Sequence, residues 1–324
     1  MPILPPRLEA GLCDRLLSLA AMQTDVVRRS QLLDIGLTAG VIDRMLEARR
    51  WQTDAGGLVV VLHNGPLTQI QREAVAVLAG GRVCALAART AAARAGLVGW
   101  QSPDSIVEVV VPRGTTYPDL ALVDVKVHES RRFTEDDVHP SAWPPRVGIE
   151  RALVDAACWS RRPRSACGVL AAGVQQNLTV ATRLMAELEL AGKVRFHRLL
   201  RRVLADIDGG AQAVSEIDFI RFCARNGLPK PTRQVVRRDA NGKRRYLDAV
   251  LVGPAGEVRV EIDGALHLVV QTYWADMSRG NDLSIAGEGT LRFPSFVIYG
   301  NDQDALRQLR LALGLSGPDR QTAA

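Results

Sequence analysis

The sequence lacks a long hydrophobic run. No stretch of about eighteen apolar residues occurs, and charged residues such as Arg7, Glu9 and Asp14 interrupt the apolar runs near the N-terminus. A transmembrane helix needs about 20 apolar residues in a row, and a signal peptide needs an uninterrupted apolar core. We therefore expect neither, and predict a cytoplasmic protein with no membrane partner.

Cysteine is also scarce. The five cysteines are odd in number and widely spaced, and no two of them form a Cys-x-x-Cys pair. Disulfide frameworks and zinc sites are normally built from regularly spaced cysteines. We therefore predict buried free thiols in a reducing compartment.

Lysine occurs only four times, although lysine and arginine together number 41. Arginine thus supplies most of the positive charge behind the net charge of +6. The guanidinium group suits phosphate recognition, but a GC-rich genome produces the same preference for arginine. The charge therefore permits a polyanionic partner without establishing one.

The most informative stretch spans residues 244–267. Tyr246–Val252 and Val258–Asp263 are rich in apolar and β-branched residues, and the turn residues between them predict a β-hairpin. Side chains alternate between the two faces of a strand, which predicts that Glu261 and Asp263 share a face, with Asp248 on the partner strand. Carboxylates gathered on one face repel each other unless a cation such as Mg²⁺ binds them.

This hairpin resembles the active-site hairpin of the PD-(D/E)XK nuclease superfamily, in which an Asp precedes a Glu-x-Lys motif. The superfamily lysine is replaced here by Asp263. The similarity is closer to the very-short-patch-repair-like endonuclease domain and covers about the last third of the chain. Other segments that carry it are Ser215-Glu216, Gly227–Pro231, Gln234, Arg245–Asp248, Gly264 with His267, Trp274–Arg279 and Leu291–Pro294.

The resemblance implies a metal-dependent endodeoxyribonuclease and assigns roles to particular residues. Asp248 and Glu261 would hold Mg²⁺ or Mn²⁺, with Glu216 completing the site unless it only stabilises the start of its helix. Asp263 or His267 would assist the attacking water. Arg279 would neutralise charge on the phosphate, or form only a surface ion pair with Asp276.

The N-terminal segment predicts a winged helix-turn-helix. Helical spacing over residues 8–22, 30–36 and 38–48 precedes a turn at residues 54–57 and a strand at 58–62. The segment resembles the N-terminal domain of type IV antitoxins of the abortive-infection family. We predict DNA contacts through Arg44, Arg49 and Arg50, or alternatively a domain that serves only protein contacts or packing.

Basic residues near the hairpin favour a phosphate backbone as ligand. Those flanking the predicted site are Arg237, Arg238, Lys243, Arg244 and Arg245. Further upstream, residues 193–204 are predicted to form a helix on which Arg195, Arg198 and Arg202 make one basic stripe. That stripe is either a phosphate contact or a solvated helix face.

The remaining pattern predicts alternating helices and strands. Helices are expected at residues 71–78, 85–95, 149–159, 165–176, 180–191, 215–225, 273–285 and 302–313, and strands at 106–111, 123–128, 233–238, 290–293 and 295–299. Residues 66–208 resemble the partner domain of the same antitoxin-like proteins. No catalytic constellation is evident there, and His128 and His139 are predicted to be isolated surface residues.

We therefore predict an α/β (α+β multidomain) protein. Its expected parts are a winged-helix domain (residues 1–65), a mixed α/β middle domain (66–208), a restriction-endonuclease-like mixed sheet flanked by helices (209–316) and a tail (317–324). The expected function is a Mg²⁺-dependent DNA endonuclease or nickase, which has a protein partner or homodimerises through the N-terminal or middle domain. The alternatives are a non-enzymatic antitoxin-like DNA-binding regulator with a degenerate nuclease fold, and a hydrolase of RNA or nucleotides.

Overall fold

The computed structural model describes residues 2–100, 106–208, 216–238, 244–263, 281 and 290–315. For residues 216–217, 233–238, 244–248 and 263 it describes the backbone alone. The described chain combines helices with small sheets, in agreement with the predicted mixed α/β class. It divides into two compact units, Met1–Ala152 and Leu153–Ala324, called here the N-terminal and C-terminal units.

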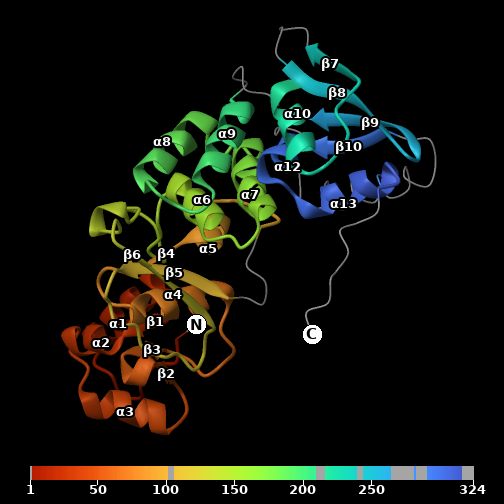
Figure 1. Cartoon of the computed structure of the whole chain (residues 1–324). Coiled ribbons are helices and arrows are strands. Elements are labelled where there is room, and N and C mark those ends of the chain that lie inside the picture. Colours follow the sequence, from red (N-terminus) through yellow and green to blue (C-terminus); the bar gives the residue numbers. More distant parts are fainter. Residues whose placement is uncertain are drawn as a thin grey trace. The chain divides into compact units, whose positions relative to one another are not determined.

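The N-terminal unit begins with three helices and a three-stranded antiparallel sheet in the order β1-β3-β2 (Figure 1). The elements are α1 (Ala10–Met22), β1 (Val26–Arg28), α2 (Arg29–Asp34), α3 (Ala39–Glu47), β2 (Gln52–Asp54), the short 3₁₀-helix η1 (Ala55–Gly57) and β3 (Val59–Val61). A core that includes Leu16, Leu32, Ile42 and Trp51 joins the helices to the sheet. The predicted helical segments and final strand are therefore confirmed, whereas β1 was not anticipated.

The rest of the N-terminal unit is built on a sheet in the order β4-β5-β6. Its elements are α4 (Gln69–Ala79), β4 (Ala85–Leu86), α5 (Ala88–Arg94), β5 (Val107–Pro112), β6 (Val125–Ser130) and the 3₁₀-helix η3 (Glu135–Asp137). The single helix predicted over residues 85–95 is wrong at its start, because Ala85 and Leu86 pair with β5 instead. Burial of both residues against the sheet outweighs the helix propensity of the alanine-rich run.

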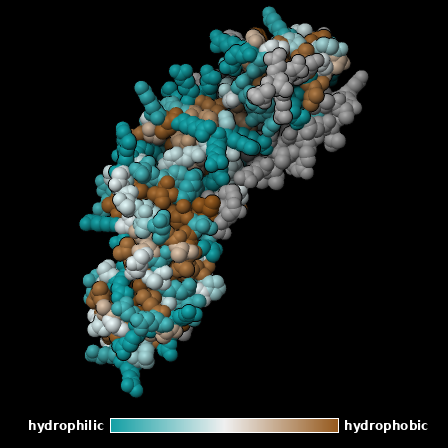
Figure 2. All heavy atoms as spheres, turned by 60° about the horizontal axis from the view of Figure 1, so that its bottom comes forward, coloured by the Kyte–Doolittle hydropathy of each residue, from teal (hydrophilic) through white to brown (hydrophobic). Residues whose placement is uncertain are grey.

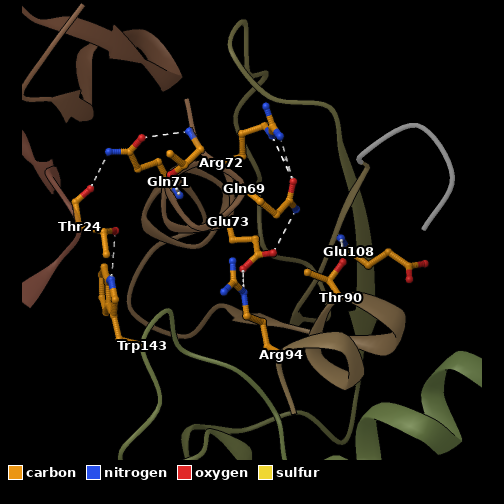
Figure 3. Close-up of polar contacts among 10 residues, drawn as sticks. Thr24, Gln69, Gln71, Arg72, Glu73, Thr90, Arg94, Glu108 and Trp143 are labelled. Carbon is orange, nitrogen blue, oxygen red and sulfur yellow. Dashed lines mark hydrogen bonds and ion pairs between the residues drawn. The ribbon is translucent and has the colours of Figure 1, made fainter. Parts of the chain in front are cut away.

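Side-chain hydrogen bonds fix α4 within the N-terminal unit (Figure 3). Gln71 donates from Nε2 to the Thr24 carbonyl at 3.1 Å, and the Trp143 indole donates to the Thr24 hydroxyl at 3.4 Å. On the same helix the buried Glu73 accepts from Gln69 at 3.0 Å and forms an ion pair with Arg94 of α5. These contacts join segments far apart in the sequence, and because every buried polar group among them has a partner, they stabilise the unit.

Helices dominate the first part of the C-terminal unit. Helix α6 (Ile149–Cys158) enters it and is followed by α7 (Pro163–Gln175), α8 (Ala181–Ala191) and α9 (His197–Ile207). Helix α9 begins at His197 because Phe196 has a left-handed backbone with φ 63°. Arg195 therefore precedes the helix, and the predicted stripe Arg195–Arg198–Arg202 is wrong in its first member.

A four-stranded sheet in the order β10-β9-β8-β7 forms the second part of this unit (Figure 1). Its elements are α10 (Glu216–Arg225), β7 (Arg233–Arg238), β8 (Arg244–Gly253), β9 (Gly256–Asp263), β10 (Thr290–Pro294), α12 (Ser295–Gly300) and α13 (Gln303–Ala312). Strands β7, β8 and β9 are antiparallel neighbours, whereas β10 runs parallel to β9. The sheet is therefore mixed.

The strand predicted over residues 295–299 is a helix instead. Pro294 ends β10, and α12 follows directly with Phe296, Val297 and Ile298 all buried. A short run that is apolar at every position fits a buried helical turn as well as a buried strand, and its periodicity does not distinguish the two.

Hydrophobic side chains form limited areas on the face shown in Figure 2, where hydrophilic side chains surround them. None of the helices in the part of the chain that the structure describes is long and apolar enough to cross a membrane.

Candidate functional site

The predicted acidic positions lie on paired strands of the C-terminal sheet. In the β8–β9 hairpin, Asp248 is directly opposite Glu261, and Tyr246 is directly opposite Asp263. Directly opposed residues of an antiparallel pair occupy the same face, about 4.5–5.5 Å apart. Asp248, Glu261 and Asp263 thus occupy positions on one face of the hairpin, as the alternation of the sequence predicted.

Burial shows which face this is. Val258, Val260 and Ile262 of β9 are buried, and so are the β10 residues Leu291 and Phe293 that pair with the last two of them. The alternate positions of these strands are more accessible: Glu261 is half-buried and Arg292 is exposed. Glu261, and the positions of Asp248 and Asp263 that share its face in the register, therefore lie on the face opposite these buried residues.

The carboxylate of Glu261 pairs with an arginine from the next strand. Arg292 of β10 is directly beside Glu261 in the parallel register, and its Nε lies 2.8 Å from Oε2 of Glu261. The side chains retain 60% and 32% of their accessible surface, respectively, so water still reaches the pair. Arg292 was not among the predicted site residues, although its position in the Leu291–Pro294 segment was part of the family resemblance.

The backbone of Arg292 is itself held in place. Asn281 accepts from the Arg292 N–H at 2.8 Å and donates to its carbonyl at 2.9 Å. The same amide donates to Gln308 of α13 at 3.2 Å, and both Asn281 and Gln308 are buried. Asn281 thereby satisfies both backbone groups of Arg292 and fixes the strand at the residue that pairs with Glu261.

The other predicted catalytic and metal-binding residues are placed only in part. Glu216 is the first residue of α10, as predicted. His267 and Arg279 lie outside the described residues, and Asp248 and Asp263 are described by backbone position alone. Among side chains that the structure does describe, no three of the His, Cys, Asp and Glu type gather as metal ligands.

The predicted basic residues beside the hairpin also follow the strands. Arg237 is opposite Tyr246, and Arg238 is opposite Arg244, with an irregularity in the register between Arg237 and Arg238. Arg245 follows in β8, while Lys243 lies outside the described residues. The basic positions that are described therefore meet at the end of the sheet where β7 ends and β8 begins.

The predicted nucleic-acid contacts of the N-terminal unit lie at the end of α3. Arg44 is in the last turn of this helix, Arg49 and Arg50 follow it, and all three side chains are exposed. The acidic Asp43 on the same helix accepts a hydrogen bond from Arg29 at 2.6 Å. This pairing reduces the negative charge that the sequence placed beside the arginines.

Strands β5 and β6 carry a polar cluster around Glu108 that the sequence pattern did not predict. One carboxylate oxygen of the buried Glu108 lies 3.2 Å from Lys126 Nζ and 3.4 Å from His128 Nε2, and the other accepts from the Arg89 N–H at 3.1 Å. Burial by itself raises the pKa of Glu108. The hydrogen bond with His128, the positive charges of Lys126 and His128, and the Arg89 N–H outweigh it and lower the pKa to about 2.

This cluster corrects the prediction for His128. Its side chain is only 11% exposed and contacts Glu108, so it is neither isolated nor on the surface. His139, in contrast, is exposed as predicted. Because cationic and N–H donors surround both oxygens of Glu108, the cluster binds β5, β6 and the start of α5 together and has the features of a structural ion-pair network.

No protein-family model matches the chain, and no curated protein matches it. The crystal structure of the RV2827C protein from Mycobacterium tuberculosis is similar over 65% of this chain and 83% of that chain, with 17% sequence identity and a TM-score of 0.41. The functional assignment therefore rests on the residues of this chain alone.

Proposed function

We propose that the protein is a metal-dependent DNA endonuclease or nickase whose site lies on the accessible face of the β8–β9 hairpin. The observation that carries this proposal is the direct pairing of Asp248 with Glu261, together with the position of Asp263 on the same face. Carboxylates gathered in this way destabilise the fold unless a ligand balances their negative charge. The side chain of Glu261 keeps 32% of its surface accessible, which supports a cation and a phosphate as that ligand.

The donor set fits a hard divalent cation. Carboxylate oxygens are the ligands that Mg²⁺ and Mn²⁺ prefer. Glu261 already accepts a positive group, since the Arg292 guanidinium occupies one of its oxygens. Asp248 and Glu261 would hold the metal, with Glu216 as a further ligand, and the ion would supply a more acidic bound water and a polarised phosphate.

The chain's own groups would complete the reaction. Asp263 or His267 would accept the proton of the attacking water. Arg279 would stabilise the negative charge on the phosphate oxygens, and the basic positions around Arg237 and Arg244 would bind the backbone on either side of the scissile bond. In the N-terminal unit, Arg44, Arg49 and Arg50 would bring the protein to DNA.

Conversion of a supercoiled plasmid tests the proposal. Purified protein should nick or linearise the plasmid in Mg²⁺ or Mn²⁺ and leave it intact in EDTA. Glu261→Gln should abolish conversion, whereas Glu257→Gln, which removes the same charge at an exposed position of the same strand, should convert the plasmid at the wild-type rate. Equal conversion by wild type and Glu261→Gln would contradict the assignment of the site.

A second candidate is a non-enzymatic DNA-binding regulator. The ion pair between Arg292 and Glu261 favours it, because Arg292 already balances the negative charge of Glu261 without a metal. In that case the protein would cleave no duplex, single-stranded or mismatched DNA, yet would bind duplex DNA with an affinity that falls steeply as salt is raised.

A further inference from the structure

An open groove of about 950 Å³ lies in the C-terminal unit. It adjoins a smaller cavity of about 330 Å³, with which it shares Arg202, Arg225 and Tyr299. Because they share these residues, the two are together called here the arginine groove. None of its lining residues belongs to the acidic site on the β8–β9 hairpin.

Three helices frame the arginine groove. Helix α12 contacts both α9 and α10 (Figure 1), and its residues Ile298 and Tyr299 line the depression between them. Two buried or half-buried hydrogen bonds hold α12 in place: Ser295 donates to Asp206 of α9 at 2.6 Å, and Asn226 donates to Asn301 at 2.6 Å. These bonds fix α12 to α9 and to the residue that follows α10.

Arginines from both flanking helices line the groove in pairs. Arg198 and Arg202 are one turn apart on α9, and Arg221 and Arg225 are one turn apart on α10, so each pair lies on one side of its helix. All four side chains are exposed at the groove. Arg202 also lies over the Tyr299 ring, with its guanidinium carbon 5.4 Å from the ring centre.

The groove carries excess positive charge. The cationic lining residues are Lys193, Arg198, Arg202, Arg221 and Arg225, and the carboxylates are Glu189 and Asp218. Glu189 is already paired with Arg201 at 3.1 Å, which reduces its negative charge toward the groove. Burial and the nearby charges of Asp206 and Asp218 raise the pKa of Tyr299, so the groove floor adds no negative charge.

We infer that the arginine groove binds the sugar–phosphate backbone of a DNA strand. The guanidinium group is suited to phosphate oxygens. The cations come from two helices and from the segment before α9, and they line the open groove of about 950 Å³ as well as the smaller cavity beside it. A row of cations along an open groove fits a chain of phosphates better than a single phosphate-bearing small molecule. The inference rests on the proposed function only in naming DNA as the polyanion.

Anisotropy measurements with a fluorescein-labelled 30-base-pair duplex in EDTA test the inference without any cleavage. The variant R198Q/R221Q/R225Q leaves Arg202 on Tyr299 and removes three charges from the groove. It should weaken binding at least about tenfold at 0.1 M salt and lower the slope of log K against log salt by about 2–3. The control R82Q/R113Q/R131Q removes three exposed arginines of the N-terminal unit and should bind as wild type does.

Unchanged affinity and slope in the groove variant would overturn the inference, and so would an equal loss in the control. The inference would also be overturned if polyglutamate displaced the labelled duplex as effectively as unlabelled DNA does, since the groove would then select negative charge alone. If the variant does not fold, modification of the wild-type arginines by phenylglyoxal tests the inference in its place. DNA should protect Arg198, Arg221 and Arg225 from the reagent. Equal modification with and without DNA would refute the inference. Because no metal is present, failure of the nuclease proposal leaves these results interpretable.

Discussion

Replacing Arg292 by Gln should tighten the binding of Mg²⁺ to the protein in the absence of DNA. Nε of Arg292 lies 2.8 Å from Oε2 of Glu261, so the guanidinium would compete with the proposed metal for this carboxylate. A metal that binds Glu261 must therefore displace this arginine or share the carboxylate with it.

The expected magnitude follows from the exposure of the pair. An ion pair whose members retain 60% and 32% of their accessible surface contributes about 0.5 kcal/mol. Repulsion between a guanidinium and a divalent ion that share one carboxylate, weakened by water and by physiological salt, would add a similar amount, about 0.5 kcal/mol. Together these amount to about 1 kcal/mol, so the Kd for Mg²⁺ should fall about fivefold.

Calorimetric titration of metal-free protein with Mg²⁺, repeated with Mn²⁺, measures this effect. Arg292→Lys is the matched control, because it keeps the positive charge beside Glu261 and should leave the Kd near the wild-type value. Weaker metal binding by Arg292→Gln than by wild type would refute the reasoning, because Arg292 would then support the metal site and not compete with it.

Three further outcomes follow from the described residues. The lowered pKa of Glu108 stabilises the fold by about 3 kcal/mol; this stabilisation is fully present above the ordinary pKa of 4.5 and is lost as the pH falls toward 2. In urea unfolding at pH 7, Glu108→Gln should therefore reduce the free energy of unfolding by about this amount, and that free energy should vary less with pH in the acid range. An unchanged urea midpoint would count against the ion-pair network. Of the five cysteines only Cys13 is not buried, so a thiol-reactive dye should label Cys13 in the native protein and all five in denaturant; rapid labelling of a second native thiol would contradict the packing. A Cβ on Gly253 would lie 2.4 Å from the Leu313 carbonyl oxygen, while one on Gly40 would meet nothing within 4 Å. In urea unfolding, Gly253→Ala should therefore destabilise the protein by about 1–3 kcal/mol, and Gly40→Ala should not. Equal urea midpoints for the two variants would argue against this close approach of the hairpin to the end of α13.

The β8–β9 hairpin could be predicted from the sequence because its information is local. Alternation of apolar and polar residues in Val258–Asp263 fixes which positions share a face, and turn residues separate it from the partner strand. The turn is tighter than predicted, since Gly253 already pairs with Gly256. The faces assigned to Glu261 and Ile262 were nevertheless correct.

Features that depend on distant segments could not be predicted in this way. The contacts of Glu108 with Lys126 and His128 exist because β5 and β6 pair in parallel, and no local pattern specifies that partner. The only signal was that Lys126 and His128 are two residues apart, on one face of a predicted strand. The ion pair of Glu261 with Arg292 likewise requires the pairing of β9 with β10.

The start of α9 was predicted incorrectly for a different reason. Residues 193–204 have helical spacing throughout, yet the backbone leaves the helical region at Phe196. The four groove arginines come from α9 and α10, and they face one depression only because α12 packs against both helices. The sequence therefore identified a basic helix, but not the groove that it lines.

The single-turnover rate of duplex cleavage as a function of Mg²⁺ concentration tests whether the β8–β9 hairpin holds a catalytic metal. We expect no cleavage in EDTA, a rate that rises to saturation with Mg²⁺ in the wild type, and no cleavage at any Mg²⁺ concentration for Glu261→Gln. Cleavage that persists in EDTA, or that is the same in Glu261→Gln as in the wild type, would contradict a metal site on the β8–β9 hairpin. Absence of cleavage by the wild type in both Mg²⁺ and Mn²⁺ would favour the DNA-binding regulator.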